Sequence, residues 1–194
     1  MNSCAVAVAA KDNDGDDRWL SIHNRFLLDA RDKDPEVIFL GDSILQFLEH
    51  TEIWNQWFAP LHSLNFSIHK DQTQNVLWRI VNGELDNVHP KLSPNSYIFL
   101  QNLLPRGQHP NKLRDKNNKV NEILKEKVMS MNRVEVVSID KGFVQPDGTI
   151  SHYDMHDYLL LTNAGCRKAF EPLYELLTQI LSEGEIEKDL TPSE

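Results

Sequence analysis

A serine, Ser43, lies three residues after the end of an apolar run. Val37–Leu40 has the length and β-branched content of a strand buried on both faces, and Ile44–His50 has the apolar spacing of a helix. Ser43 therefore lies on a strand–turn–helix, at the strand end where open parallel sheets bind ligands. Its hydroxyl suits a nucleophile, or a helix cap that accepts backbone N–H groups. The tripeptide Gly41-Asp42-Ser43 alone leaves both roles open.

The rest of the chain alternates short apolar runs with amphipathic stretches. The expected strands are Val37–Leu40, Leu64–Phe66, Tyr97–Leu100 and Val134–Val137. The expected helices are Arg18–Asp32, Ile44–His50, Gln72–Leu85, Pro110–Met131 and Ala164–Leu181. On the fourth helix we expect Val120, Ile123 and Leu124 to face inward. This alternation predicts an α/β domain with a parallel sheet wrapped by helices.

The composition is that of one ordinary globular domain. The 194 residues, 40% hydrophobic and 25% charged, suffice for one core but not comfortably for two. The formal charge of −9 argues against a nucleic-acid partner, because such binding needs lysine and arginine to neutralise phosphates. Cys4 and Cys166 have neither metal-ligand spacing nor a disulfide framework. We therefore expect a reducing, cytoplasmic location.

Both ends of the chain are expected to be tails, residues 1–17 and the acidic residues 184–194, around a folded domain at 18–183. Lys11–Asp17 superficially resembles a calcium loop but lacks the terminal glutamate and the flanking helices of an EF-hand. Ala5–Ala10 lacks the basic flank and the length of a signal peptide. No stretch reaches the about 20 apolar residues of a membrane helix, so no stable membrane insertion is expected.

A series of sequence blocks carries a family resemblance. In chain order they are Gly41-Asp42-Ser43, Glu52-Ile53-Trp54, Pro60-Leu61-His62, Leu64-Asn65-Phe66, Val76-Leu77-Trp78-Arg79, Asn82-Gly83-Glu84-Leu85, Leu103-Leu104-Pro105-Arg106-Gly107-Gln108-His109-Pro110, Gly142-Phe143-Val144, Asp147-Gly148-Thr149-Ile150-Ser151 and Asp157-Tyr158-Leu159. Together they resemble the catalytic α subunits of type Ib platelet-activating factor acetylhydrolase. The resemblance runs from about Arg18 to Leu181, nearly the whole domain.

The resemblance implies an SGNH hydrolase with a flavodoxin-like three-layer α/β/α sandwich. Such enzymes cleave short acyl esters, such as the acetyl group of platelet-activating factor, without a metal or other cofactor. In the family the serine attacks the ester, while its backbone amide, a glycine and an asparagine hold the oxyanion. An Asp-x-x-His supplies the base and its orienting acid. On this pattern Ser43 matches the nucleophile and Asp157 the orienting acid.

Three departures from the family pattern concern the catalytic groups. The base position holds Leu160, which neither accepts nor donates a proton. The oxyanion glycine is replaced by Lys70, so we expect a distorted oxyanion hole. Only the eleven residues Leu92–Asn102 stand where the family has a strand, an asparagine loop, a helix and the next strand. One strand–helix unit is therefore expected to be missing, with the asparagine.

These departures predict a non-catalytic member of the family. The alternative is a weak or altered serine esterase that releases acetyl groups from phospholipids like platelet-activating factor. It needs another base, for which His69, His152 and His156 are candidates, although His152 and His156 do not lie three residues after Asp157. The sequence leaves this alternative open.

Partners are implied by the resemblance alone. In the family, α subunits pair with one another and with a WD-repeat subunit, the lissencephaly protein linked to dynein. A homodimer, a heterodimer with a related α subunit, or binding of the WD-repeat subunit is therefore expected here. Trp54, Trp57 and Trp78 suit a core better than an interface. A missing strand either exposes edges that aggregate or is compensated if the 97–100 strand moves beside the first strand.

Overall fold

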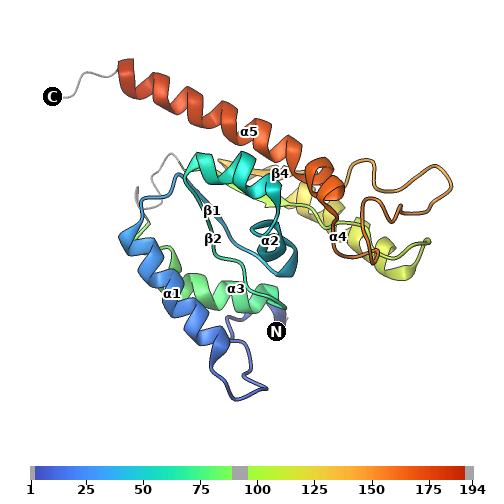
Figure 1. Ribbon diagram of the computed structural model, residues 1–194, viewed down its shortest axis with the longest axis horizontal. Coiled ribbons are helices and arrows are strands. Elements are labelled where there is room, and N and C mark those ends of the chain that lie inside the picture. Colours follow the sequence, from blue (N-terminus) through green and yellow to red (C-terminus); the bar gives the residue numbers. More distant parts are fainter. Residues whose placement is uncertain (1–2, 89–95, 191–194) are drawn as a thin grey trace. The chain divides into compact units, whose positions relative to one another are not determined.

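The computed structural model describes residues 3–88 and 96–190 of the chain. These residues belong to two compact units, Met1–Ser96 and Tyr97–Glu194. In Figure 1 the N-terminal unit is coloured from blue to green and the C-terminal unit from yellow to red. Each unit contains strands and helices that alternate along the chain, as the sequence predicts.

The N-terminal unit contains the predicted helices and strands to within a few residues. Its regular elements are α1 (Arg18–Asp32), β1 (Val37–Phe39), α2 (Ser43–Leu48), β2 (Ser63–Asn65) and α3 (Thr73–Arg79). Short helical turns lie at Ser3–Ala5, Trp54–Phe58, Ala59–Leu61 and Ile80–Glu84. The last of these turns extends α3, and Gly83 within it adopts a φ of 102°, a conformation that favours glycine. The predicted helix at Gln72–Leu85 is therefore confirmed with a kink near its end.

The C-terminal unit contains β3 (Ile98–Gln101), α4 (Lys112–Val128), β4 (Val134–Val137) and α5 (Asn163–Leu190). Helix α5 is longer than expected, since it continues past Leu181 into the acidic segment. That segment is rich in glutamate, a good helix former, which offsets its lack of apolar residues. Residues 191–194 of the expected tail lie outside the described part of the chain.

All four strands pair in parallel. β1 pairs with β2, with Val37 opposite Ser63, and β3 pairs with β4, with Ile98 opposite Val134. Among the described residues these pairs form two separate two-stranded sheets. The predicted parallel α/β arrangement is confirmed, and the strand at 97–100 pairs with β4.

The core of the N-terminal unit is built from aromatic residues on α1, β1 and the segments around β2. The rings of Phe26 and Phe66 stack with their centroids 4.7 Å apart, and Ala30 and Ile68 are buried beside them. On another part of the unit Phe39 packs against the rings of Trp54 and Phe58. Figure 1 shows β1 and β2 side by side, with α1 and α3 next to them.

The buried face of helix α4 differs from the predicted one. Val120 and Ile123 were expected to face inward, but they are 39% and 44% exposed. Arg114, Asn121 and Val128 are buried instead, and their spacing of seven residues places them on one face.

Hydrogen bonds to the loop after β3 explain which face of α4 is buried. Asn121 donates to the Leu103 carbonyl and accepts from the Leu103 N–H, and Asn117 donates to the Leu104 carbonyl. Arg114 donates to the carbonyls of Gly107 and Gly148. Because buried backbone groups must be paired, these polar side chains determine the buried face.

The N-terminal segment contacts α3 through its backbone. The Val8 N–H donates to the Gln74 carbonyl at 3.1 Å, and the Asn75 side chain donates to the Val8 carbonyl at 3.0 Å. The side chain of Val8 remains exposed. Part of the segment predicted as a tail is thus hydrogen-bonded to the fold, while the 18–183 domain boundary stays a prediction.

Candidate active site

Ser43 is the first residue of α2, and its side chain is not the cap of that helix. The carboxylate of Asp42 accepts from the Ile44 N–H at 2.9 Å, and the Asp42 carbonyl accepts from the Gln46 N–H. Since Asp42 caps the helix, the Ser43 hydroxyl is left for other contacts. Of the two roles that the tripeptide left open, the structure assigns the capping role to Asp42.

The hydroxyl of Ser43 is instead bonded to the loop after β2. The Lys70 N–H donates to Ser43 Oγ at 3.0 Å, and His69 Nδ1 lies 2.9 Å from the same oxygen. Ser43 is half-buried, whereas His69 and Lys70 are exposed. The structure thus brings together the serine, one of the three candidate bases and the residue expected at the oxyanion position.

Lys70 has a left-handed backbone, with a φ of 64°. That conformation costs a residue with a side chain about 1–2 kcal/mol, which is why glycine suits such a position. The expected strain is therefore present, yet the Lys70 N–H still points at Ser43 Oγ. A backbone amide can keep its direction when its side chain changes.

Asn65 joins the start of this loop to α2. Its side-chain nitrogen donates to the Leu45 carbonyl at 2.7 Å, and its oxygen accepts from the Ser67 N–H at 3.1 Å. The Ile68 N–H then donates to the Gly41 carbonyl at 3.1 Å. These bonds hold the loop beside the turn that carries Ser43.

The other end of the loop is anchored by a buried arginine. Arg79 is fully buried and donates to the Asp71 carboxylate at 2.9 Å, the Phe66 carbonyl at 2.7 Å and the Glu84 carboxylate at 2.6 Å. Phe66 and Asp71 flank the residues that contact Ser43. Arg79 therefore fixes both ends of the segment that presents the Lys70 amide.

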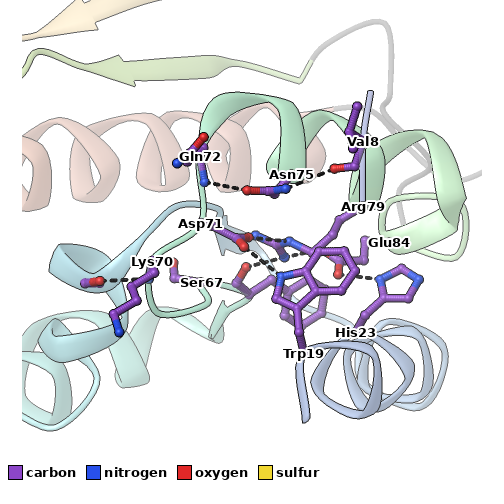
Figure 2. Close-up of polar contacts among 12 residues, drawn as sticks. Val8, Trp19, His23, Ser67, Lys70, Asp71, Gln72, Asn75, Arg79 and Glu84 are labelled. Carbon is purple, nitrogen blue, oxygen red and sulfur yellow. Dashed lines mark hydrogen bonds and ion pairs between the residues drawn. The ribbon is translucent and has the colours of Figure 1, made fainter. Parts of the chain in front are cut away.

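Helix α1 completes this buried cluster. Trp19 Nε1 donates to Asp71 at 2.7 Å, and His23 Nδ1 lies 2.7 Å from Glu84. Figure 2 shows Arg79 joined to both Asp71 and Glu84, with Trp19 on Asp71, His23 on Glu84, and the Lys70 side chain pointing away from the cluster. Sequence reasoning did not identify this cluster. The sequence signal for it was weak, namely two opposite charges, Arg79 and Glu84, within the helix expected at Gln72–Leu85.

Burial dominates the electrostatics of this cluster. Removal from water raises the pKa of Asp71 and of Glu84, although the guanidinium of Arg79 acts in the opposite direction. Two carboxylates share one arginine here, so its charge compensates only one of them. The raised pKa values follow mainly from burial, which the opposing contacts with Arg79, Trp19 and His23 offset only in part.

Asp157 lies in the C-terminal unit, where its carboxylate is bound to the backbone. Asp157 Oδ1 accepts from the N–H groups of Leu159 at 3.0 Å and Leu160 at 2.7 Å. Partial burial acts to raise its pKa, but these two hydrogen bonds outweigh it and lower the pKa of Asp157. In this chain the carboxylate stabilises a tight loop.

An open hollow of about 540 Å³ adjoins Asp157 within the C-terminal unit. Its lining includes the cationic side chains of Arg106 and Lys112 and no histidine. The nearby His152 ring packs against Tyr153, with centroids 4.2 Å apart, and His156 is exposed. The position expected for the base holds the half-buried side chain of Leu160.

The described residues contain no group of histidine, cysteine, aspartate or glutamate side chains suited to a metal ion. Within the same residues, no helix is both long and apolar enough to cross a membrane.

Comparisons with known proteins identify the family. No family model matches the sequence. The chain is 52% identical over 225 residues to the platelet-activating factor acetylhydrolase IB subunit beta homolog of Drosophila melanogaster, with 100% of both chains covered. It is 43% identical over 221 residues to subunit alpha2 of Rattus norvegicus, covering 98% of this chain and 96% of that protein. The chain belongs to the platelet-activating factor acetylhydrolase IB subunit family.

The structure agrees with membership of the acetylhydrolase IB family. A GDSL-like lipase from Bacteroides thetaiotaomicron has a similar fold, with a TM-score of 0.61 at 12% identity, covering 84% of this chain and 98% of that chain. The alignment with the Drosophila relative spans 225 positions and this chain has 194 residues, so 31 aligned positions have no counterpart here. Ser43 and the Lys70 amide thus belong to a GDSL-type fold.

Proposed function

We propose that this chain is a non-catalytic member of the acetylhydrolase IB family that acts as a dimerising or regulatory subunit. The observation that carries the proposal is the loop at Asp157, whose carboxylate binds the N–H groups of Leu159 and Leu160. In the family pattern this carboxylate orients a histidine three residues later. Here that position is a leucine, so the acid has no base to orient.

The magnitude of this loss decides against turnover. A leucine neither takes the serine proton nor protonates the leaving alcohol, and loss of a triad histidine lowers turnover by about 10⁶. Loss of one oxyanion donor lowers it by a further factor of about 10² to 10³, although such losses do not add. Either change alone makes the chain a poor esterase.

The proposal includes the loss of one strand–helix unit from a flavodoxin-like three-layer sandwich. The 31 aligned positions without a counterpart in this chain support it. The expected deletion falls partly on residues 89–95, which lie outside the described part of the chain. The lost unit would include the asparagine that holds the oxyanion in the family.

The proposed partners are a second copy of this chain, a related α subunit, or the WD-repeat subunit, in the cytoplasm. The family membership supports them, because the surface of the domain is inherited along with its fold. Size-exclusion chromatography of the purified chain, alone and mixed with each subunit, tests this part. Co-elution with one of the two subunits, or a dimeric mass for the chain alone, is expected. A monomer that binds neither would contradict the subunit role.

A weak serine esterase acting on acetyl esters like platelet-activating factor is the second candidate. The contacts of Ser43 Oγ with the Lys70 N–H and His69 Nδ1 favour it, since they supply an amide donor and an imidazole. It ranks second because the asparagine that holds the oxyanion in the family and the base histidine are both missing from this sequence.

Steady-state hydrolysis of an acetyl ester separates the two candidates. Purified chain is compared with Ser43→Ala, and we expect equal rates. A rate that depends on Ser43 would contradict the non-catalytic function. The Leu160→His variant is measured in parallel, because recovery would locate the defect in the base, whereas no recovery would locate it in the oxyanion hole.

A further inference from the structure

We infer that Ser43 and His69 form a nucleophile–base pair that transfers one acyl or phosphonyl group from a reactive ester or fluorophosphonate onto Ser43. This goes beyond the proposed function, because it concerns one covalent transfer and not turnover. It also replaces the base of the family pattern with a residue from the loop after β2.

The inferred pair places the Ser43 proton between Oγ and His69 Nδ1. Ser43 Oγ accepts from the Lys70 N–H at 3.0 Å and lies 2.9 Å from His69 Nδ1, and its own hydrogen is free to point at that nitrogen. This assignment requires the tautomer that carries its proton on Nε2, which leaves Nδ1 as the acceptor. The distance is that of a general base in contact with its nucleophile.

Both partners are held by backbone bonds on either side. The Ile68 N–H donates to the Gly41 carbonyl, two residues before Ser43 and one residue before His69. Arg79 fixes Phe66 and Asp71 at the two ends of the loop. These bonds hold the backbone beside both Ser43 and His69, and all of these residues lie in the N-terminal unit.

The Lys70 N–H supplies an oxyanion donor beside the nucleophile and the base. It lies at Ser43 Oγ, so an oxygen of a reagent bonded to Oγ is within reach of the same donor. A backbone amide at that place stabilises the negative charge that develops during attack. Its left-handed conformation holds the amide in this direction whatever the Lys70 side chain does.

The step balances as follows. With a fluorophosphonate, the Oγ–P bond forms, the P–F bond breaks, fluoride leaves and the Ser43 proton passes to His69 Nδ1. With p-nitrophenyl acetate, the Oγ–C bond forms, the ester C–O bond breaks and nitrophenolate leaves. Neither leaving group needs an acid, so the missing family histidine is not required for this half of the reaction.

Release of the acyl or phosphonyl group from Ser43 has different chemical requirements. It requires water to attack an ordinary alkyl ester of serine, or a stable phosphonyl ester, with the Lys70 N–H and the Ser43 N–H as the only donors that the family pattern leaves. Because serine is a poorer leaving group than fluoride or nitrophenolate, the modified chain is expected to accumulate. The inferred activity is therefore the capture of one group per chain.

Labelling with a fluorophosphonate that carries a reporter tests the inference. The full chain is incubated with the probe, and the rate and stoichiometry are followed by intact mass and by peptide mapping. We expect one label, on Ser43, and none in Ser43→Ala. In His69→Gln the labelling rate should fall about 100-fold or more, since glutamine keeps the polar contact but does not accept a proton.

Three matched variants make the outcome specific. His50→Gln changes another exposed histidine of the same unit, and His152→Gln and His156→Gln change the other candidate bases. All three should label at the parent rate, and circular dichroism checks that each variant is folded. Absence of labelling, labelling at another residue, or an equal rate in His69→Gln would overturn the inference. Steady-state hydrolysis tests the proposed function separately.

Discussion

The loop that carries Lys70 and the loop that carries Asp157 respond differently to substitution. At Lys70 the side chain differs from the family glycine, yet the backbone N–H still contacts Ser43. At Leu160 the backbone N–H is also well bound, to Asp157, but the function expected there depended on an imidazole side chain. A site built from backbone groups survives a change of residue, and a site built from one side chain does not.

The Lys70 loop and the segment after β3 are anchored by different chemistry. In the N-terminal unit a fully buried arginine with two carboxylates holds the segment from Phe66 to Asp71. In the C-terminal unit the segment after β3 is held largely by neutral amides, those of Asn117 and Asn121. Buried charges become costly when unpaired, whereas a lost amide bond costs less, so the two anchors should differ in their sensitivity.

Removal of the buried arginine should have the largest effect. Arg79→Met leaves Asp71 and Glu84 buried without their shared cation, so the free energy of unfolding should fall by about 3–5 kcal/mol. Urea unfolding at pH 7 measures it. The control is Lys119→Met, at a solvent-screened pair with Glu122, where the stability should stay almost unchanged. Equal effects in the two variants would contradict the comparison.

Loss of the amide anchor should have an intermediate effect. Asn121→Ala leaves the N–H and carbonyl of Leu103 without their side-chain partner, which should lower the free energy of unfolding by about 1–3 kcal/mol. Asn118→Ala changes an exposed asparagine on the same helix and accounts for the difference in helix propensity. If both variants unfold at the same urea concentration, the polar face of α4 does not stabilise the loop.

The raised pKa of Glu84 predicts how stability depends on pH. A carboxyl whose pKa is raised by folding contributes most below its ordinary value of 4.5, and that contribution is lost as the pH rises through the folded pKa. The Glu84→Gln variant has no carboxyl to titrate at this position, so it does not lose stability in this way. The difference in unfolding free energy between variant and parent should therefore move in favour of Glu84→Gln as the pH rises above about 4.5. Movement in favour of the parent would mean that Arg79 lowers the pKa of Glu84.

The smallest effect should come from relief of strain at the oxyanion position. Lys70→Gly removes a left-handed conformation that costs about 1–2 kcal/mol, while the freer unfolded chain offsets about 0.4–1 kcal/mol. Thermal unfolding should therefore show a net gain between about 0 and 1.6 kcal/mol. Lys70→Ala removes the side chain but not the strain, so it should show no gain. A gain in both variants would assign the effect to the lysine side chain.

The fold could be predicted from the sequence to the extent that local pattern determines it. The strand at Val134–Val137 and the helix at Arg18–Asp32 agree with their predicted bounds, because apolar periodicity is a local signal. The buried face of α4 could not be predicted, since Asn121 is buried for a hydrogen bond to Leu103 that periodicity does not encode. The extension of α5 past Leu181 was missed because helix propensity alone, without an apolar face, gave a weak signal.

The candidate site was predicted in part. The position of Ser43 after the first strand follows from the sequence, but its contact with His69 joins residues 26 apart across a strand pairing. The cluster around Arg79 also depends on pairing over long distances, since Trp19 and Asp71 are 52 residues apart. Such contacts appear only when the chain is folded.

A stopped-flow burst measurement with p-nitrophenyl acetate tests the contrast between the two loops most directly. If Ser43 keeps its nucleophilic contacts and turnover is lost, about one nitrophenolate per chain should be released rapidly, followed by a steady rate equal to that of Ser43→Ala. A continuing rate that depends on Ser43 would show that another group replaces the family base in turnover. Absence of any burst would show that the contacts with His69 and Lys70 do not activate the serine.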